Sequence, residues 1–205
     1  MKDKVFIVGI NGSPHKKGTT AKLLKKALDS AKKYGAKTFL IDIVDKNIKQ
    51  CLGCYSVKHD SCEYPCKQKD DMQEIYKILL KSDAIIFASP IYWFNVTGLM
   101  KNFIDRLTCL ECSGFMLEGK IAGFISVSKE DEGGNIVPSM LMASILNHMG
   151  LIIPPYAMMY YPAFEGDWNW SVKDLDLLAK SIIKLSKSIK KSKIKSWDYK
   201  DKLPV

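Results

Sequence analysis

The residue types best suited to binding phosphate follow the first apolar segment of the chain. Residues 4–10 read KVFIVGI, as a buried strand would, and a turn-rich segment at 11–18 precedes a helical pattern that starts at Thr19. The hydroxyls of Ser13, Thr19 and Thr20 can donate to phosphate oxygens, and the unpaired N–H groups and dipole of a helix start favour an anion there. The spacings of a P-loop and of a dinucleotide fingerprint are absent from this segment. It therefore predicts a cradle for one phosphate group, the alternative being an ordinary strand-to-helix turn capped by threonine.

A second candidate segment follows the apolar run at 83–88 and reads SPIYWFNVTG over residues 89–98. Its three consecutive aromatic residues, Tyr92, Trp93 and Phe94, are hard to bury together after the end of a strand. They are well placed to flank a planar ring, and the backbone amides of such a loop can bind the polar edge of the ring. The alternatives are a satellite hydrophobic cluster or an oligomer interface, and an interface is compatible with a ligand site because pockets often lie between subunits.

Cysteines gather in the segment 45–69, which has no clear periodicity. Four of them fall within sixteen residues: Cys51, Cys54, Cys62 and Cys66. Four thiolates can hold a [4Fe–4S] cluster or a tetrahedral zinc ion, and a loop without a metal is the third alternative. A second pair, Cys109 and Cys112, is interpreted as buried or interfacial, because a redox C-x-x-C pair normally opens a helix and this one would close a helix.

Apolar strands alternate with amphipathic helices along most of the chain. Strands are expected at 4–10, 37–43, 83–88, 121–127 and from 151, and helices at 19–33, 70–81, 97–107, 135–149 and 171–194. This alternation predicts an α/β fold with a doubly wound five-stranded parallel sheet, in the order 2-1-3-4-5, with helices on both faces. In such a fold the ligand lies beyond the carboxyl ends of strands 1 and 3, which precede the phosphate and aromatic segments. We expect a single domain over 1–205, with a Cys-rich loop at 45–69 and a Lys-rich helix and tail at 171–205.

The formal net charge of +9 is concentrated late in the chain, where residues 173–202 hold ten lysines against four aspartates. No nucleic-acid reading motif with interleaved aromatics accompanies this charge, so a solvated lysine-rich helix face is favoured over a nucleic-acid-binding surface. No run of 18 apolar residues and no signal-peptide pattern is present, which predicts a cytoplasmic protein without a membrane partner. Large apolar residues in the expected loops, at 92–94 and 158–161, predict a homo-oligomer.

Three motifs in this order resemble the NAD(P)H-dependent FMN reductase family of flavodoxin-like proteins, and within it the iron–sulfur flavoproteins. They are GxNGSPxxxGTT from Gly9, KDDM after the cysteines, and ASPIYWxNVTGxMKNFIDR from Ala88 to Arg106. The resemblance covers residues 4–155. It implies a flavodoxin-like fold with FMN bound noncovalently near a subunit interface, in a homodimer or a homotetramer.

The resemblance also implies which residues contact the FMN. The phosphate would be held by Ser13, His15, Lys16, Thr19 and Thr20. The isoalloxazine ring would be lined by Pro90, Ile91, Tyr92, Trp93, Asn95 and Val96. The loop after the fourth strand would approach from the other side with Ser126, Gly133 and Gly134. His15 stands where the family usually has arginine, which weakens the phosphate clamp because an unperturbed histidine is mostly neutral at pH 7.

The iron–sulfur flavoproteins resembled here use the compact motif C-x2-C-x2-C-x(4–7)-C as cluster ligands. This chain departs from the motif, because Val57 occupies the third position and Cys62 is the nearby substitute. If a cluster forms, the expected ligands are Cys51, Cys54, Cys62 and Cys66.

The resulting functional hypothesis is an FMN-dependent oxidoreductase in which the flavin carries the chemistry and no side chain acts as a catalytic acid or base. The donor is NAD(P)H if no cluster is present, with a quinone, free flavin or other small molecule as acceptor. It is ferredoxin or a similar carrier if a cluster is present, and the charge of +9 would steer an acidic carrier to the protein. The rival hypothesis is a non-enzymatic flavodoxin-like binding or regulatory module.

Overall fold

The computed structural model describes residues 4–58, 61–129, 133–163 and 171–192. In this part of the chain five parallel strands form one sheet in the order β2-β1-β3-β5-β6. They are β1 (Phe6–Asn11), β2 (Lys37–Asp42), β3 (Ala84–Tyr92), β5 (Ile121–Ser128) and β6 (Met158–Pro162). When these five strands are numbered along the chain, their order is the predicted 2-1-3-4-5, so the expected doubly wound fold is confirmed.

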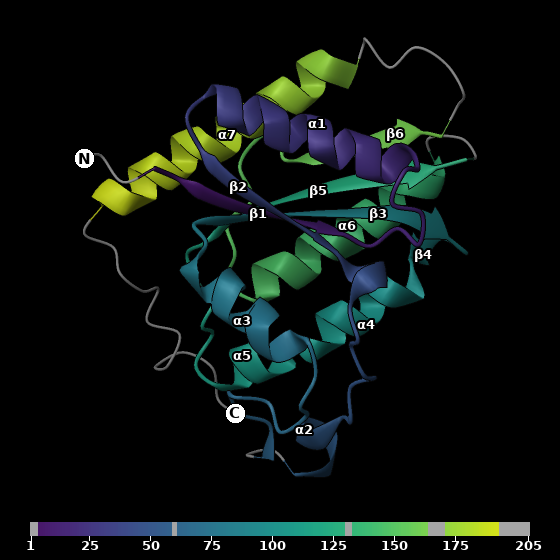
Figure 1. The fold of residues 1–205 in the computed structure, drawn as a ribbon, viewed down its shortest axis with the longest axis vertical. Coiled ribbons are helices and arrows are strands. Elements are labelled where there is room, and N and C mark those ends of the chain that lie inside the picture. The colour runs from purple at the N-terminus through teal and green to yellow at the C-terminus, as the bar shows by residue number, and fades with distance from the viewer. Residues whose placement is uncertain (1–3, 59–60, 130–132, 164–170, 193–205) are drawn as a thin grey trace.

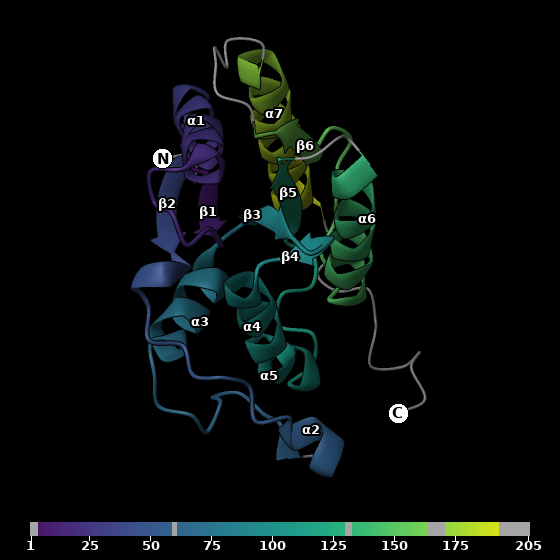
Figure 2. The ribbon, with the colours of Figure 1, turned by 90° about the vertical axis from the view of Figure 1, so that its right-hand side faces the viewer.

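Helices cover both faces of the sheet (Figures 1 and 2). One face carries α1 (Thr19–Lys33) and α7 (Ser171–Lys191). The other carries α3 (Met72–Lys81), α4 (Gly98–Arg106), α5 (Thr108–Cys112) and α6 (Gly133–His148). Because both faces are covered, every residue of β5 is buried, as in other parallel sheets.

The pattern of apolar residues in α1 explains how this helix packs against the sheet. Its apolar side chains recur at helical spacing, and Leu23, Leu24 and Leu28 are buried against the sheet. The helix ends at Lys33 with Tyr34 as its C-cap, and Gly35 follows with a φ of +83°, a left-handed conformation that suits glycine.

The last strand lies later than the sequence predicts. A strand was expected from residue 151, but Ile152 makes only an isolated bridge to Ile121, and the pairing resumes in β6. Pro154 and Pro155 separate the two, and proline has no N–H to donate to a neighbouring strand. The expectation that residues 158–161 form an exposed loop is therefore wrong: they lie in β6, where Tyr161 is buried.

The aromatic segment was also expected to be a loop, and the structure differs there too. β3 continues to Tyr92, the chain turns at Trp93 and Phe94, and β4 (Asn95–Val96) returns antiparallel to β3. Both turn residues have positive φ, 50° and 58°, which matches the twist of a tight two-residue hairpin. We call residues 91–96 the aromatic hairpin.

The Cys-rich segment leaves β2 through η1 (Ile43–Asp45) and contains the short helix α2 (Cys54–Val57). In both views α2 lies on the far side of α4 and α5 from the sheet (Figures 1 and 2). The segment is attached to α4 by Asn102, whose side chain donates to the Ile48 carbonyl at 3.1 Å and accepts from the Cys51 N–H at 3.3 Å.

A buried ion pair makes the second attachment. The side chains of Arg106 and Asp70 are 1% and 0% exposed, and the guanidinium contacts both carboxylate oxygens. Arg106 also donates to the Lys49 carbonyl at 2.8 Å, and Asp70 accepts from the N–H groups of Lys49 and Met72 at 2.9 and 3.1 Å. The pair thus joins both ends of the Cys-rich segment to the end of α4.

We predict that Asp70→Asn lowers the free energy of unfolding by about 3–5 kcal/mol, because it leaves the guanidinium buried without its counter-charge. Urea denaturation followed by far-UV circular dichroism measures the change. The matched control is Asp105→Asn, which removes only the exposed ion pair with Lys101 and is expected to change stability by less than about 1 kcal/mol. Equal losses in the two variants would contradict a structural role for the buried pair.

The same carboxylate gives wild-type stability a pH dependence. Burial raises the pKa of Asp70, but the hydrogen bonds from Arg106 and from two backbone N–H groups outweigh it and hold this pKa below its usual value. A lowered folded-state pKa stabilises the fold above the unfolded value of about 4, and this contribution is lost as the pH falls through the folded value. As the pH falls from about 4 to about 2, the free energy of unfolding should therefore decrease less in Asp70→Asn than in wild type.

Candidate functional site

The turn after β1 is held by its own polar groups. The Asn11 side chain accepts from the Ser13 N–H at 3.1 Å, and the Ser13 hydroxyl accepts from the His15 N–H at 3.0 Å. Gly18 precedes α1 in an extended conformation and, within the described residues, makes no side-chain cap for the helix. The first N–H groups of α1 are thus left to face an anion, which is the arrangement of a phosphate cradle.

Hydrogen bonds lock this turn to the segment after β3. The Gly12 N–H donates to the Ala88 carbonyl at 2.8 Å, and the Thr97 hydroxyl donates to the Gly12 carbonyl at 2.7 Å. The Thr97 N–H donates to the Ser89 hydroxyl at 3.1 Å. Thr97 also caps α4 by accepting from the Met100 N–H at 3.1 Å. The cradle and the aromatic hairpin therefore have fixed positions relative to each other.

The aromatic hairpin projects its tip into solvent. Trp93 is 94% exposed and Phe94 is 66% exposed, whereas Val96 at the base is buried. Positive φ is rare for such bulky residues, and strained backbone of this kind clusters at ligand sites. Tyr92 pairs with Asn95 across the hairpin, and the Asn95 side chain accepts from the Val96 N–H at 2.8 Å. The hairpin thus presents exposed aromatic surface, and its base is joined to the cradle through Gly12, Ala88 and Thr97.

The expected phosphate contacts differ in their surroundings. Ser13 and Thr20 are buried, Thr19 is half-buried, and His15 and Lys16 are exposed. The Lys16 ammonium lies 2.9 Å from the Asp45 carboxylate, and this hydrogen bond, with the attraction of the carboxylate, raises its pKa. A phosphate would share Lys16 with Asp45.

The predicted ring contacts come from two strands. Pro90 and Ile91 are half-buried near the end of β3. Ser126 is fully buried in β5, and its hydroxyl lies 3.2 Å from that of Ser139, so its side chain is directed at α6. Gly133 and Gly134 are the first residues of α6. Residues 130–132 of the loop before them lie outside the described part of the chain.

Sequence reasoning assigned no role to Asn11 or Thr97, which position the two loops. The capping role of Thr97 could have been predicted, because a Thr just before an amphipathic run is a typical N-cap. The role of Asn11 could not have been predicted in this way. Its side chain also contacts the Asp42 carboxylate at 2.7 Å, and Asp42 lies at the end of β2, far away in the sequence.

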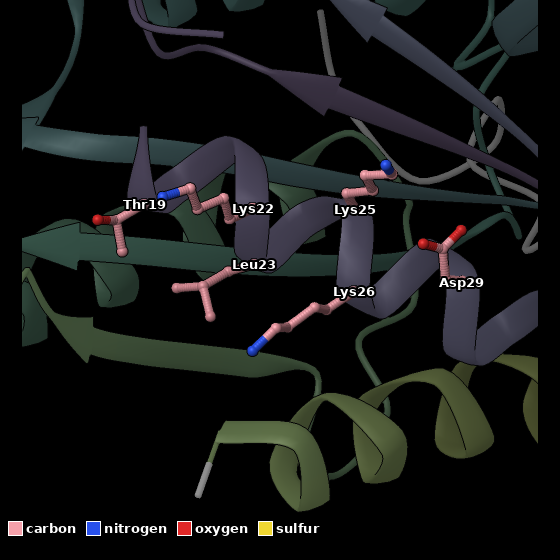
Figure 3. A pocket seen from close by; sticks show the side chains of 6 residues that line it. All are labelled: Thr19, Lys22, Leu23, Lys25, Lys26 and Asp29. Atoms are coloured by element: carbon pink, nitrogen blue, oxygen red, sulfur yellow. The ribbon is translucent and has the colours of Figure 1, made fainter. Parts of the chain in front are cut away.

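A shallow hollow lies along α1, next to the cradle (Figure 3). It is lined by Thr19, Lys22, Leu23, Lys25, Lys26 and Asp29. It shares Thr19 with the cradle but includes no residue of the aromatic hairpin, so it is not the place of a ring bound there. Its three lysines add positive potential near the start of α1, which attracts phosphate-bearing molecules.

The cysteines of the segment 45–69 are free thiols in the structure. Among the described residues, no three His, Cys, Asp or Glu side chains are placed to hold a metal ion. Burial raises the pKa of the Cys62 thiol to about 12, with the neighbouring thiols of Cys112 and Cys109 adding to it. The four-cysteine ligand set stays a prediction.

Comparisons with known proteins match this geometry. Residues 5–163 match the family model described as NADPH-dependent FMN reductase. The chain belongs to the NADPH-dependent FMN reductase family. It is therefore an FMN-dependent oxidoreductase, and the predicted family, enzyme class and FMN cofactor are confirmed; NADPH is the donor that the family's description names.

Several curated relatives carry the name iron–sulfur flavoprotein. One, from Archaeoglobus fulgidus, is 30% identical over 194 residues, which are 89% of this chain and 92% of the relative. Another, from Methanocaldococcus jannaschii, is 34% identical over 128 residues, 62% of this chain and 64% of the relative. The crystal structure of RosB with a bound 8-demethyl-8-formylriboflavin-5'-phosphate superposes with a TM-score of 0.74 at 17% identity, over 92% of this chain and 81% of RosB. That superposition supports the fold.

No helix in the described residues is long and apolar enough to cross a membrane.

We predict that Gly12→Ala destabilises the protein by about 1–3 kcal/mol and separates the two loops. A Cβ at Gly12 would lie 2.8 Å from Met100 Cε, 2.9 Å from Met100 Cβ and 3.2 Å from the Ala88 carbonyl oxygen. The matched control is Gly98→Ala at the first residue of α4, where a Cβ meets no atom of the described chain within 4 Å. Thermal unfolding of both variants tests the prediction. It fails if the Gly12 variant unfolds at the same midpoint temperature as the control.

Proposed function

We propose that the chain binds one FMN at the carboxyl ends of β1 and β3, and catalyses electron transfer from NAD(P)H to a small acceptor such as a quinone or a free flavin. The observation that carries this proposal is the phosphate cradle locked to the aromatic hairpin through Gly12, Ala88 and Thr97. When bound, FMN accepts a hydride and passes on its electrons. The protein itself contributes by binding and positioning the cofactor and the substrates.

The cradle suits the phosphate of FMN for two reasons. The uncapped start of α1 offers N–H donors and the positive end of the helix dipole. The hydroxyls of Thr19 and Thr20 add donors at the same turn, and Thr20 is buried, which excludes water from its contacts. The Ser13 hydroxyl would join them by giving up its 3.3 Å hydrogen bond to the His15 carbonyl. Since His15 is exposed and the Lys16 charge is shared with Asp45, the neutral donors supply most of the proposed phosphate contacts.

The aromatic hairpin suits the ring of the same cofactor. Pro90, Ile91 and Tyr92 continue β3 past the cradle, and the turn at Trp93 holds its side chain in solvent. A planar ring lying along this surface would cover exposed aromatic area and gain stacking and burial. The open side of the ring would stay accessible to the nicotinamide donor and to the acceptor in turn.

Ferredoxin is the second candidate donor, and the relatives named iron–sulfur flavoprotein favour it. The net charge of +9 would increase the association rate with an acidic carrier. This alternative needs a cluster in the Cys-rich segment, whereas direct reduction by NAD(P)H needs only the flavin site.

The cofactor site is tested with Thr19→Ala combined with Thr20→Ala. Loss of two phosphate donors should weaken FMN binding by about 1–3 kcal/mol, roughly 5- to 150-fold in Kd. Fluorescence titration of FMN into the apoprotein measures the change. Thr108→Ala is the control, because this hydroxyl donates to the Asp105 carbonyl on α4, far from the cradle. An unchanged Kd in the double variant would refute the assignment of Thr19 and Thr20 as phosphate contacts.

We further propose that the protein is a homodimer, or a homotetramer built from such dimers, with α6 at the interface. Four apolar residues of α6 are 46–66% exposed: Ile136, Val137, Met140 and Leu141. α6 contacts β4, the returning strand of the aromatic hairpin, and the two elements lie side by side (Figure 2). Monomers rarely expose so much contiguous apolar surface, and a second copy of the chain would cover it beside the flavin.

Val137→Glu with Met140→Glu should therefore convert the oligomer to monomers, because each charge would be buried unpaired at the interface. Light scattering at micromolar concentration measures the mass. Leu177→Glu is the control, since it places the same charge on a 42% exposed leucine of α7, away from α6. A monomeric wild-type protein, or a double variant that keeps the wild-type mass, would refute the interface.

A further inference from the structure

One edge of the sheet is formed by β2, which pairs only with β1 among the described residues. The Lys37 N–H donates to the Val5 carbonyl at 2.8 Å, so the backbone of Lys37 faces β1. Because backbone groups alternate in direction along a strand, the next residues to face β1 are Phe39 and Ile41. The other three residues of β2 direct their N–H and C=O groups outward, away from β1: Thr38, Leu40 and Asp42.

The side chains at this edge are apolar where an isolated edge strand usually carries charge. Phe39 is 45% exposed and Leu40 is 39% exposed, and residues 38–41 (TFLI) include no charge and no proline. Native edge strands commonly use a charged residue or a proline to prevent another strand from pairing with them. The middle of β2 lacks both, so another strand can add to this edge.

We propose that the β2 edges of two copies of this chain pair antiparallel about a twofold axis at Leu40, and that this contact joins two α6 dimers into a homotetramer. The inference rests on the proposed α6 dimer, to which it adds a second interface. α6 contacts β5 and β6, at the opposite end of the sheet from β2, so both interfaces can form at once (Figure 2).

The backbone of β2 is complementary to a second copy of itself in this register. Thr38 would lie opposite Asp42 of the partner subunit, and Leu40 would lie opposite the partner's Leu40. Each of these residues directs its backbone outward, and in an antiparallel pair such residues exchange both of their N–H···O=C bonds. The outward N–H and C=O groups of β2 would therefore all be paired.

The side chains are complementary in the same register. The Thr38 hydroxyl, which makes no hydrogen bond within the described residues, would lie on the same face as the carboxylate of the partner's Asp42. Phe39 would lie opposite the partner's Ile41, in the type of pair that brings side chains closer together. The polar–apolar–polar pattern of residues 38–42 is the same from both ends, as a twofold contact requires, and this favours a second copy over an unrelated strand.

One such contact is small, because β2 has only six residues. A closed tetramer of two α6 dimers would contain two of these contacts, and the two act together, since breaking one leaves the other in place. A chain that has lost the α6 interface would have only one, so it would be monomeric at micromolar concentration.

The first test is the mass of Leu40→Lys in the full-length protein. Two lysines would face each other at the centre of the pairing, and like charges directly opposite destabilise a strand pair. Light scattering at micromolar concentration should give about four chains for wild type and about two for Leu40→Lys. The matched control is Leu177→Lys, which changes a 42% exposed leucine of α7 and should keep the wild-type mass.

Amide hydrogen exchange at single-residue resolution measures the pairing itself. The Thr38 and Asp42 N–H groups should exchange about tenfold or more slowly in wild type than in Leu40→Lys, because pairing gives them an acceptor. The Phe39 and Ile41 N–H groups should exchange alike in both proteins, since they face β1. This second pair of amides shows that the substitution leaves the strand folded.

A wild-type mass of two chains, or equal exchange of the Thr38 and Asp42 amides in wild type and Leu40→Lys, would overturn the edge pairing and leave the α6 dimer intact. Slow exchange of these amides that persists after dilution to monomers would also overturn it, because a segment of the same chain would then cover the edge. A wild-type protein that is monomeric at micromolar concentration would instead refute the α6 dimer on which the inference rests.

Discussion

The contact between the ends of β1 and β3 is the constraint on which the proposed flavin site depends. Parallel strands bring their carboxyl ends to one edge of a sheet, and here the backbones meet at Gly12 and Ala88, 2.8 Å apart between N and O. A side chain at Gly12 would enter Met100, so the approach requires glycine. Thr97 closes the contact from the start of α4. The residues proposed to contact the phosphate and the ring are thus positioned before any ligand binds, which reduces the ordering that binding must impose.

The buried ion pair plays the corresponding role for the Cys-rich segment. The segment 45–69 has only the four-residue helix α2 and the end of η1 as regular structure in its described residues, so its position depends on contacts with the rest of the chain. Besides contacting each other, Arg106 and Asp70 make three hydrogen bonds to the backbone of Lys49 and Met72. A buried ion pair adds little net stability compared with an apolar pair, but breaking it is costly. Its effect is to select one arrangement of the segment, which places Cys66 beside a guanidinium.

Sequence predicted the elements whose signals are local. β3 and β5 can be recognised from their apolar runs, and α1 from the helical spacing of its apolar residues. Each pattern reflects which faces of the element are buried. The start of β6 was missed because an apolar run at Leu151 looks like a strand until the two prolines after it are weighed. The aromatic hairpin was missed because its turn holds bulky residues at positive φ, where turn rules expect asparagine or glycine.

The contacts of the site were less predictable, since they join residues far apart in sequence. Motifs identified the loops that hold Ser13, Thr20 and Tyr92, but Asn11 with Asp42, and Arg106 with Asp70, meet only after the sheet and α4 have formed.

The aromatic hairpin connects the two halves of the proposed function. Trp93 and Phe94 expose large apolar surface from a strained turn, an arrangement that is unfavourable in water unless something covers it. The proposed flavin would cover the side facing the cradle, and a second copy of the chain would cover the side continuous with α6. Both partners would then stabilise one conformation of one hairpin. By linkage, whichever binds first must favour the other by an equal free energy, so cofactor affinity and oligomer stability in this protein would be coupled quantities.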